Sequence, residues 1–159
     1  MNNFLRFLQV FVLGTWLGAI IFFSFAVPAS VFGILASRDE AGAVVGSALG
    51  RLHMLGVIAA IIYLVASLLL WRSNRRFAKL AALCVAMMLL STLASSRLVL
   101  PRMNALRAEM GSVAATPASD SRRMEFDRLH GVSVELEAGL LLIGIVALFL
   151  TANAGKEKS

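Results

Sequence analysis

Charged side chains are scarce in this chain of 159 residues. They make up 15% of the sequence, whereas hydrophobic residues make up 59%. Soluble domains typically contain about 25% charged and about 45–50% apolar residues. So little charge excludes an ordinary water-soluble domain, and the composition predicts a protein that lies in lipid.

Cysteine is nearly absent as well, since Cys84 is the only one. One cysteine cannot form an internal disulfide or a cysteine-based metal motif, so we interpret Cys84 as a small packing residue. The chain also lacks a glycine-rich phosphate loop and the interleaved basic and aromatic residues of nucleic-acid-binding proteins. It shows no nucleophile–base pair and no paired catalytic carboxylates at a readable spacing. We therefore expect no nucleic-acid partner and do not expect an enzyme.

Long apolar runs dominate what remains. Four of them cover about residues 5–27, 53–71, 77–100 and 132–152. As helices they are each about 30 Å long, which matches the hydrocarbon core of a bilayer. The sequence therefore predicts an all-α, integral membrane four-helix bundle that forms one domain over residues 1–159.

The same unit is written twice along the chain. The triplet Arg-Leu-His occurs at 51–53 and again at 128–130, and it contains the only two histidines. An apolar run that ends in Pro28 or Pro101 lies upstream of each triplet. This pattern predicts two repeated helical hairpins, with both histidines at equal depth on the same membrane face.

The connectors between the runs also carry structure. Proline is favoured at the first position of a helix, so a helix is expected after Pro101. The second span is expected to start early, near Ala41, as one long helix. Residues 111–121 are small and polar and predict a flexible linker, after which 122–130 resumes as helix and leads into the fourth span.

Small residues recur at every fourth position in two helices. On a membrane helix this spacing makes a smooth ridge that allows close helix–helix contact. We therefore predict helix packing at Gly14, Gly18, Gly42, Gly46 and Gly50.

Polar residues inside the fourth run form a stripe. At about 100° per residue, Glu137 falls within about 20° of His130, Ser133 lies on the same side, and Glu135 lies about 140° away. An ionised carboxylate at mid-helix costs about 2.5–3.5 kcal/mol, so such residues face protein or water. The stripe is either a structural feature, whose side chains snorkel or pair with arginine, or a site for a ligand, a proton or a substrate.

We expect these polar residues to converge in one pocket at the outer ends of the helices. Its predicted members are His53, His130, Arg51, Arg102, Ser133 and Glu137. Two imidazoles on two helices could hold a haem b iron from both sides, or a metal with nearby methionines. The cofactor stays open at this point.

Lysine and arginine placement predicts the orientation. The N-terminus, the 72–79 turn and the C-terminus fall on one side, where basic residues are dense in very short segments. The other side carries eight arginines and no lysine, spread over two longer connectors. The positive-inside rule therefore predicts that both termini are cytoplasmic in a multi-pass protein of the cell membrane, such as a bacterial inner membrane. The net charge of +6 favours anionic lipid as the partner.

Several short motifs follow one another in a specific order. They are Trp16-x-Gly18, Phe22-Phe23, Ala26-x-Pro28, Ala41-Gly42 with Gly46, His53-x-x-Gly56, Pro101-Arg102-Met103-Asn104 and Phe126-x-x-Leu129-His130-x-x-Ser133. Together they resemble the DUF-4149 family, the transmembrane protein 205-like small integral membrane proteins. The resemblance covers nearly the whole chain and implies a four-span membrane protein, with His53, Pro101, Arg102 and His130 as motif positions. It does not supply a reaction.

Three functions remain open from the sequence. The first is a bundle that binds a ligand or serves as an accessory subunit of a membrane complex. The second is a haem b-binding redox protein that uses His53 and His130. The third is a subunit of a metal or small-molecule permease that works as a homo-oligomer.

Overall fold

The computed structural model describes residues 2–70 and 76–154, and these residues fold almost entirely into helix. Four of the helices are long and apolar enough to cross a membrane, as the sequence predicts. The helical segments in chain order are α1 (Asn2–Phe25), α2 (Val27–Ile34), α3 (Arg38–Leu69), α4 (Arg76–Ala94), η1 (Ser95–Val99), α5 (Leu100–Met110) and α6 (Ser121–Asn153).

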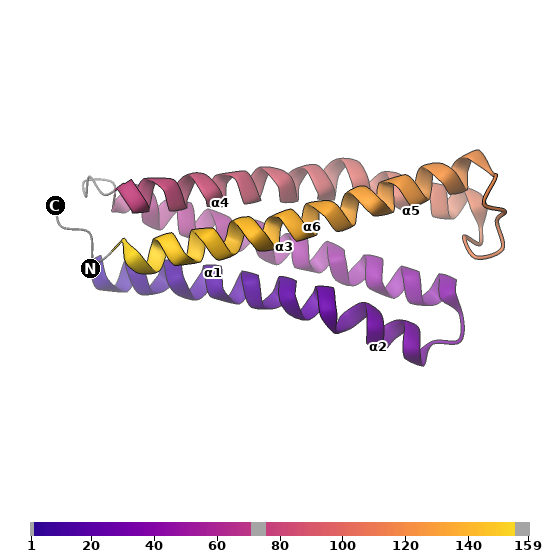
Figure 1. Ribbon diagram of the computed structural model, residues 1–159, viewed down its shortest axis with the longest axis horizontal. Helices are drawn as coiled ribbons and strands as arrows, with labels where there is room; N and C mark the ends of the chain where they lie inside the picture. Colours follow the sequence, from indigo (N-terminus) through magenta and orange to yellow (C-terminus); the bar gives the residue numbers. More distant parts are fainter. Residues whose placement is uncertain (1, 71–75, 155–159) are drawn as a thin grey trace.

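Within the described residues, the chain crosses the length of the molecule four times, in alternating directions. Figure 1 shows the start of α1 and the end of α6 at one end of the bundle, which we call the terminal end, and the α2–α3 and α5–α6 connections at the other, the distal end. One hairpin is made by α1 and α2 with α3, and the second by α4, η1 and α5 with α6. This confirms a four-helix bundle made of two helical hairpins.

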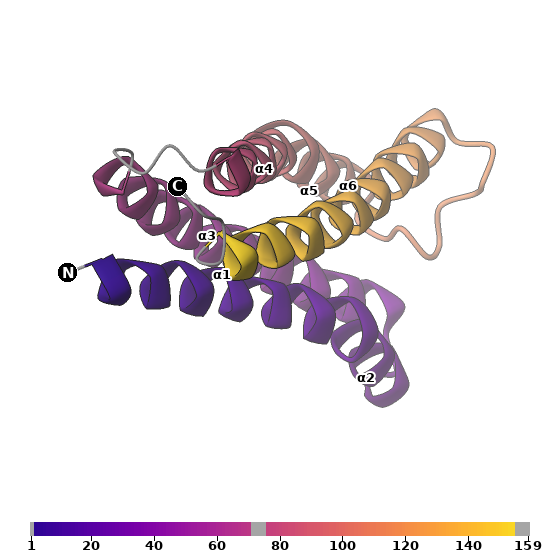
Figure 2. The ribbon, with the colours of Figure 1, turned by 60° about the vertical axis from the view of Figure 1, so that its left-hand side comes forward.

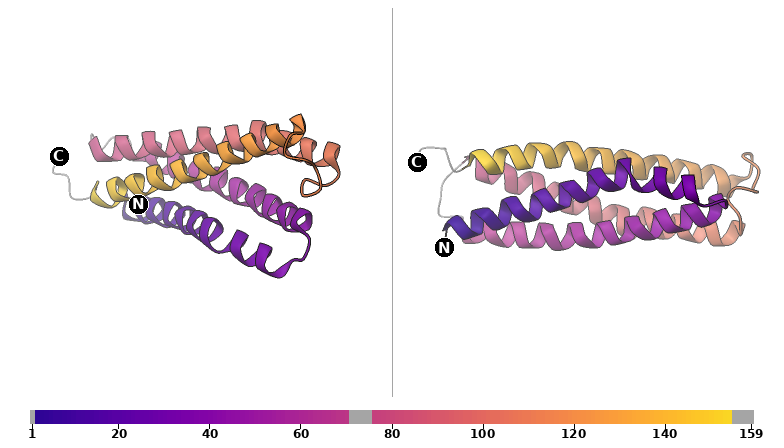
Figure 3. Two further views of the ribbon diagram at one scale, coloured as in Figure 1. Left: turned by 45° about the vertical axis from the view of Figure 1, so that its right-hand side comes forward. Right: turned by 90° about the horizontal axis from the view of Figure 1, so that it is seen from below.

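The two hairpins pack together along the axis and separate toward the distal end. Helices α1 and α3 are packed against each other, as are α4 and α6, while α3–α4 and α1–α6 contacts join the hairpins. Figures 2 and 3 show α2 turning away from the line of α1, so that the first hairpin diverges from the second.

Proline explains the irregular point in each hairpin. Pro28 has no N–H and therefore cannot donate to the carbonyl four residues earlier. The chain changes direction nearby, at Ala26, between α1 and α2. In the second hairpin Pro101 lies at the start of α5, and the preceding turn widens into the π-helical segment η1, in which the Leu100 N–H donates to the Ser95 carbonyl.

Exposed ionisable side chains indicate where the hydrocarbon layer ends. Arg51 and Glu135 are exposed and lie 18 residues from the terminal ends of α3 and α6, while exposed Arg97 lies 21 residues from the start of α4. At about 1.5 Å per residue these positions are about 27–32 Å from the terminal end. That distance equals the thickness of a bilayer core, so the distal parts of the helices extend beyond it.

Two separate clusters of buried apolar side chains stabilise the bundle. The larger one fills the membrane part and includes Trp16, Tyr63 and Met88, with Cys84 packed against it as a partly buried neighbour. The smaller one joins η1 and α5 to α6 at the distal end, and its members are Val99, Met103, Leu106 and Phe126.

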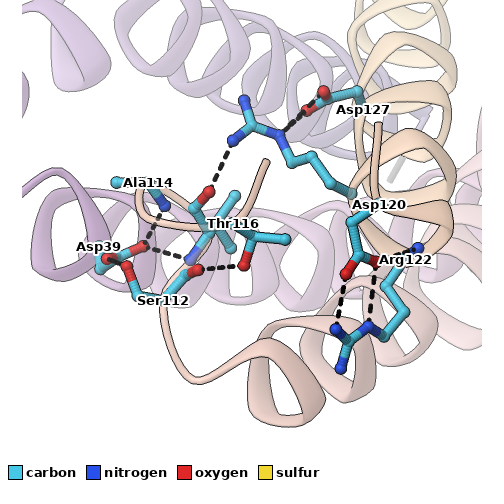
Figure 4. A network of polar contacts seen from close by, with 9 residues as sticks. Asp39, Ser112, Ala114, Thr116, Asp120, Arg122 and Asp127 are labelled. Atoms are coloured by element: carbon cyan, nitrogen blue, oxygen red, sulfur yellow. Dashed lines mark hydrogen bonds and ion pairs between the residues drawn. The ribbon is translucent and has the colours of Figure 1, made fainter. Parts of the chain in front are cut away.

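The connection between α5 and α6 is held to the start of α3. Asp39 accepts hydrogen bonds from the Ser112 hydroxyl at 2.6 Å and from the Val113 and Ala114 backbone N–H groups at 2.9 and 3.2 Å (Figure 4). Residues 111–121 were expected to be a flexible linker. In the structure this segment is bound to the first hairpin, because the Asp39 carboxylate at the start of α3 accepts hydrogen bonds from its backbone N–H groups.

Candidate functional site

The centre of the candidate site is a buried pair of ionisable side chains. His53 of α3 and Glu137 of α6 lie with Nε2 and Oε1 2.7 Å apart, and the two residues are 3% and 7% exposed. Either the imidazole N–H donates to the carboxylate, or a protonated carboxyl group donates to the imidazole. The pair can therefore hold a proton in more than one arrangement.

Each of the two side chains has a second polar atom that takes no part in this contact. His53 Nδ1 and Glu137 Oε2 are both buried and have no hydrogen-bond partner within residues 2–70 and 76–154. An unsatisfied buried polar atom costs about 1–3 kcal/mol, and more when it is charged. Such atoms are rare in native proteins and mark places where a bound group or ion would be stabilising.

Three hydroxyl side chains lie in the same stretch of the bundle. Thr92 and Ser95 are buried on one face of the α4–η1 helix, and Ser133 is buried one turn before Glu137 on α6. The hydroxyl oxygens of Thr92 and Ser95 also have no partner within the described residues. Helix α4 packs on α6, and we call the buried polar side chains in this stretch the polar layer: His53, Thr92, Ser95, Ser133 and Glu137.

This polar layer separates the two apolar clusters. On α4 and η1, Thr92 and Ser95 fall between Met88 of the large cluster and Val99 of the small one. His53, Thr92 and Glu137 each lie 16 residues from the terminal end of their helix, at about 24 Å by helical rise. The layer is therefore inside the bundle, and Ser95 and Ser133, 19 and 20 residues from the terminal ends of their helices, reach the level of the exposed arginines.

The π-helical turn lies at the same level. Ser95 is its first residue and belongs to the polar layer, and the turn ends immediately before the helix that carries Pro101. π-Helical turns are rare and occur frequently at functional sites. Pro101 is the sequence feature that predicts an irregular helix here. The sequence does not show which backbone carbonyl loses its usual hydrogen bond.

The structure brings some of the expected pocket residues together and separates others. Glu137 contacts His53, and Ser133 is buried on the same face of α6. Arg102 is instead on the surface, where its guanidinium donates to Glu125 at 2.8 Å. Arg51 is exposed and faces a groove between α1, α2 and α3. The expected convergence is thus limited to His53, Glu137 and Ser133.

The prediction that the two histidines lie at equal depth is wrong. His53 is 16 residues from the terminal end of α3, and His130 is 23 residues from that of α6, which places them about 10 Å apart along the axis. His130 is also exposed, whereas His53 is buried. The two triplets repeat in sequence, but α6 continues further toward the terminal end after its triplet. The geometry gives no support to one haem held by both rings.

The glycines that were predicted as packing positions have different surroundings. A Cβ at Gly42 or Gly46 would meet the Arg107 guanidinium at 3.4 or 3.6 Å, and one at Gly50 would meet Leu100 at 3.6 Å. A Cβ at Gly14 or Gly18 would meet nothing within 4 Å in the described chain.

Sequence reasoning missed the α4–η1 side of the site. Thr92 and Ser95 are ordinary residues in an apolar helix, and a hydroxyl can satisfy itself on the preceding turn, so neither attracts notice. Their spacing of three residues, which places both on one helix face, was the available signal. Within the described residues no group of three His, Cys, Asp or Glu side chains could hold a metal ion.

Comparison with known proteins gives a family and no close relative. A search of curated proteins and a search of solved structures each found no match. The family model described as "Domain of unknown function (DUF4149)" matches residues 11–112, which cover α2, α3, α4, η1 and α5 together with most of α1. That is well over half of the chain and includes His53, Thr92 and Ser95. The protein belongs to the DUF4149 family.

Proposed function

We propose that the protein is a small ligand-binding membrane protein and that its site is the polar layer around His53 and Glu137. The ligand that this layer suits is a proton or a small hard cation. The observation that carries the proposal is the buried His53–Glu137 contact of 2.7 Å, whose second atoms, Nδ1 and Oε2, have no partner among the described residues. Ionisable groups inside a membrane bundle mark ion or proton sites by default.

The donor set supports a hard ligand over a soft one. Glu137 offers a free carboxylate oxygen, and Thr92, Ser95 and Ser133 offer hydroxyl oxygens in the same layer. Oxygen ligands suit hard cations, whereas copper and zinc sites use sulfur and several imidazoles. His53 adds one imidazole nitrogen to this set of donors.

The cytoplasm is proposed as the location of the terminal end. This end carries the basic residues of short segments, among them Arg6, Arg76 and Lys79, which the positive-inside rule places inside the cell. The polar layer then lies in the outer leaflet half of the bundle. A role as an accessory subunit of a membrane complex is compatible with this site, while haem binding and permeation stay predictions.

The test is a comparison of thermal unfolding in nanodiscs. Na⁺, K⁺ or NH₄⁺ replaces N-methylglucamine at constant ionic strength, and the midpoint Tm is recorded for the wild type, Glu137→Gln and Glu135→Gln. Ligand that binds the folded state alone raises stability by RT ln(1 + [L]/Kd), about 2.7 kcal/mol at one hundred times Kd. We expect one cation, or lower pH, to raise the Tm of the wild type and of Glu135→Gln.

Glu135→Gln is the matched control, because Glu135 is two residues away on the same helix and is exposed. Glu137→Gln keeps a hydrogen-bonding group beside His53 and should fold while it loses the response. A purely structural pair gives a different result: Glu137→Gln then lowers the Tm by the same amount in every salt, and no cation stabilises the wild type. That outcome would overturn the proposed site.

A further inference from the structure

A groove on the outside of the first hairpin is separate from the polar layer. It has a volume of about 700 Å³ and lies where α1, α2 and α3 meet. Phe23 and Val27 line one side, and Val44 and Leu55 line the other. This volume is within the range of about 300–1,000 Å³ that is usual for small-molecule sites.

The sequence explains why this space is open. The chain changes direction at Ala26, before Pro28, so α2 leaves the line of α1. Opposite the change, α3 presents the small side chains of Ala43, Ser47 and Ala48 to the groove. Because α2 diverges from α1 and the facing residues of α3 are small, side chains do not fill the space between them.

Arg51 is the charged residue in this lining, which is otherwise apolar apart from Ser47. Arg51 is exposed, and no ion pair or hydrogen bond of its side chain is found within residues 2–70 and 76–154. None of the residues that line the groove is acidic. Arg51 lies about 27 Å from the terminal end, which is the depth of lipid headgroups at the distal face of the bilayer.

We propose that this groove binds an anionic phospholipid of the bilayer, with the lipid phosphate on Arg51 and an acyl chain along Leu52 and Leu55, on the terminal side of Arg51. The charge of Arg51 has no partner in the lining, and a guanidinium matches the geometry of a phosphate. Of the apolar lining on α3, Leu52 and Leu55 lie on the terminal side of Arg51, at the depth of acyl chains. This site does not depend on the proposed function, because His53 and Glu137 take no part in it.

The experiment measures lipid selectivity by electron paramagnetic resonance. Spin-labelled phosphatidylglycerol and spin-labelled phosphatidylcholine are each added to the protein in phosphatidylcholine vesicles, and the motionally restricted fraction gives the relative association constant. One basic residue near the membrane surface contributes about a five-fold preference for anionic lipid. We expect Arg51→Gln to remove about this factor and Arg51→Lys to keep most of it.

Arg97→Gln is the matched control, since Arg97 is another exposed arginine at nearly the same level but lies on η1, away from the groove. It should leave the selectivity unchanged. The preference of the wild type should also decrease at high salt because the contact is electrostatic. Equal losses in Arg51→Gln and Arg97→Gln would overturn the site, because general surface charge would then explain the preference.

A second set of variants tests the apolar wall. Leu55→Ser makes the wall polar on the terminal side of Arg51 without changing any charge, so it should reduce the restricted fraction of both lipids. Unchanged lipid binding in Leu55→Ser would overturn this part of the groove as the place of the acyl chain. A second copy of the chain is the competing occupant. It would be indicated by a concentration-dependent dimer in light scattering that Leu55→Ser abolishes, and this outcome would also contradict the lipid proposal.

Discussion

The indole ring of Trp16 lies directly against the backbone of Gly56, so that a Cβ added to Gly56 would be 2.6 Å from the ring atom Cε2. Trp16 is 1% exposed and belongs to the main apolar cluster, so its ring has little room to move. The contact lies between α1 and α3, one turn toward the terminal end from His53. It fixes the approach of the two helices close to the candidate site.

Gly56→Ala should destabilise the bundle. The added methyl group forces the buried ring of Trp16 or the two helices apart, and overpacking of this kind costs about 1–3 kcal/mol. Unfolding in mixed micelles with increasing SDS measures the effect. Gly139→Ala is the control, because nothing lies within 4 Å of its Cβ position and glycine itself costs a helix about 0.5–1 kcal/mol relative to alanine. Equal effects of the two substitutions would contradict the close contact.

Removing one member of the His53–Glu137 pair should lower the free energy of unfolding more than removing both. His53→Leu leaves the Glu137 carboxylate buried without its partner, and breaking such a pair costs about 3–5 kcal/mol. The double variant His53→Leu/Glu137→Leu replaces both groups by apolar side chains, which is often neutral or stabilising. We would measure the free energy of unfolding of the wild type, both single variants and the double variant. The four values give the coupling energy between His53 and Glu137.

The matched control for this cycle is Glu135→Leu, which removes an exposed carboxylate from the same helix. A surface change of this kind should stay within about 0.5 kcal/mol. If His53→Leu and Glu137→Leu instead add up to the effect of the double variant, then the two side chains do not interact in the folded protein.

The fold could be predicted from the sequence because lipid imposes one simple requirement. Spans must be helical and about 20 residues long, so four apolar runs give four helices with little ambiguity. The long helices α3 and α6 were also predicted, and no proline interrupts 41–71 or 122–152. What could not be predicted is the relative height of the helices, because the side chains that set it, such as Trp16 against Gly56, are far apart in sequence.

The site was predictable only along one helix. Helical spacing correctly assigned Ser133 and Glu137 to one face and Glu135 to another, because that argument needs no tertiary information. The partner of Glu137 depends on how α6 slides along α3. A shift of seven residues, about two turns, places His53 rather than His130 beside the polar layer. The repeated triplet was misleading because similar sequence does not ensure similar height.

Acid should loosen the start of α6 through Asp120. This residue caps the helix by accepting from the Arg122 backbone N–H at 2.8 Å, and its carboxylate also accepts from the Arg122 guanidinium (Figure 4). These bonds, chiefly the one from the Arg122 side chain, lower the pKa of Asp120 from 3.8 to about 2. Because the folded pKa is the lower one, the stabilisation is fully present above about pH 4 and is lost as pH falls toward 2.

Amide hydrogen exchange in the first turn of α6 measures this effect. Wild-type protection should decrease between about pH 4 and pH 2, after correction for the intrinsic exchange rate. In Asp120→Ala the same amides should be as weakly protected at every pH as those of the wild type are near pH 2. Asp127→Asn serves as control, since Asp127 also pairs with an arginine on the surface but does not cap the helix. A decrease that persists in Asp120→Ala would assign the titration to another group.

The terminal end of the bundle should face the cytoplasm. The basic residues of the short segments at this end predict this orientation, while the structure itself shows only that α1 starts and α6 ends on the same side (Figure 1). Cys84→Ala removes the only native thiol, and Asn3→Cys or Ser119→Cys then adds one at the exposed surface of either end. A membrane-impermeant maleimide applied to intact cells should label Ser119→Cys and should reach Asn3→Cys only after the cells are opened. The opposite pattern would place the polar layer and the Arg51 groove near the cytoplasmic leaflet.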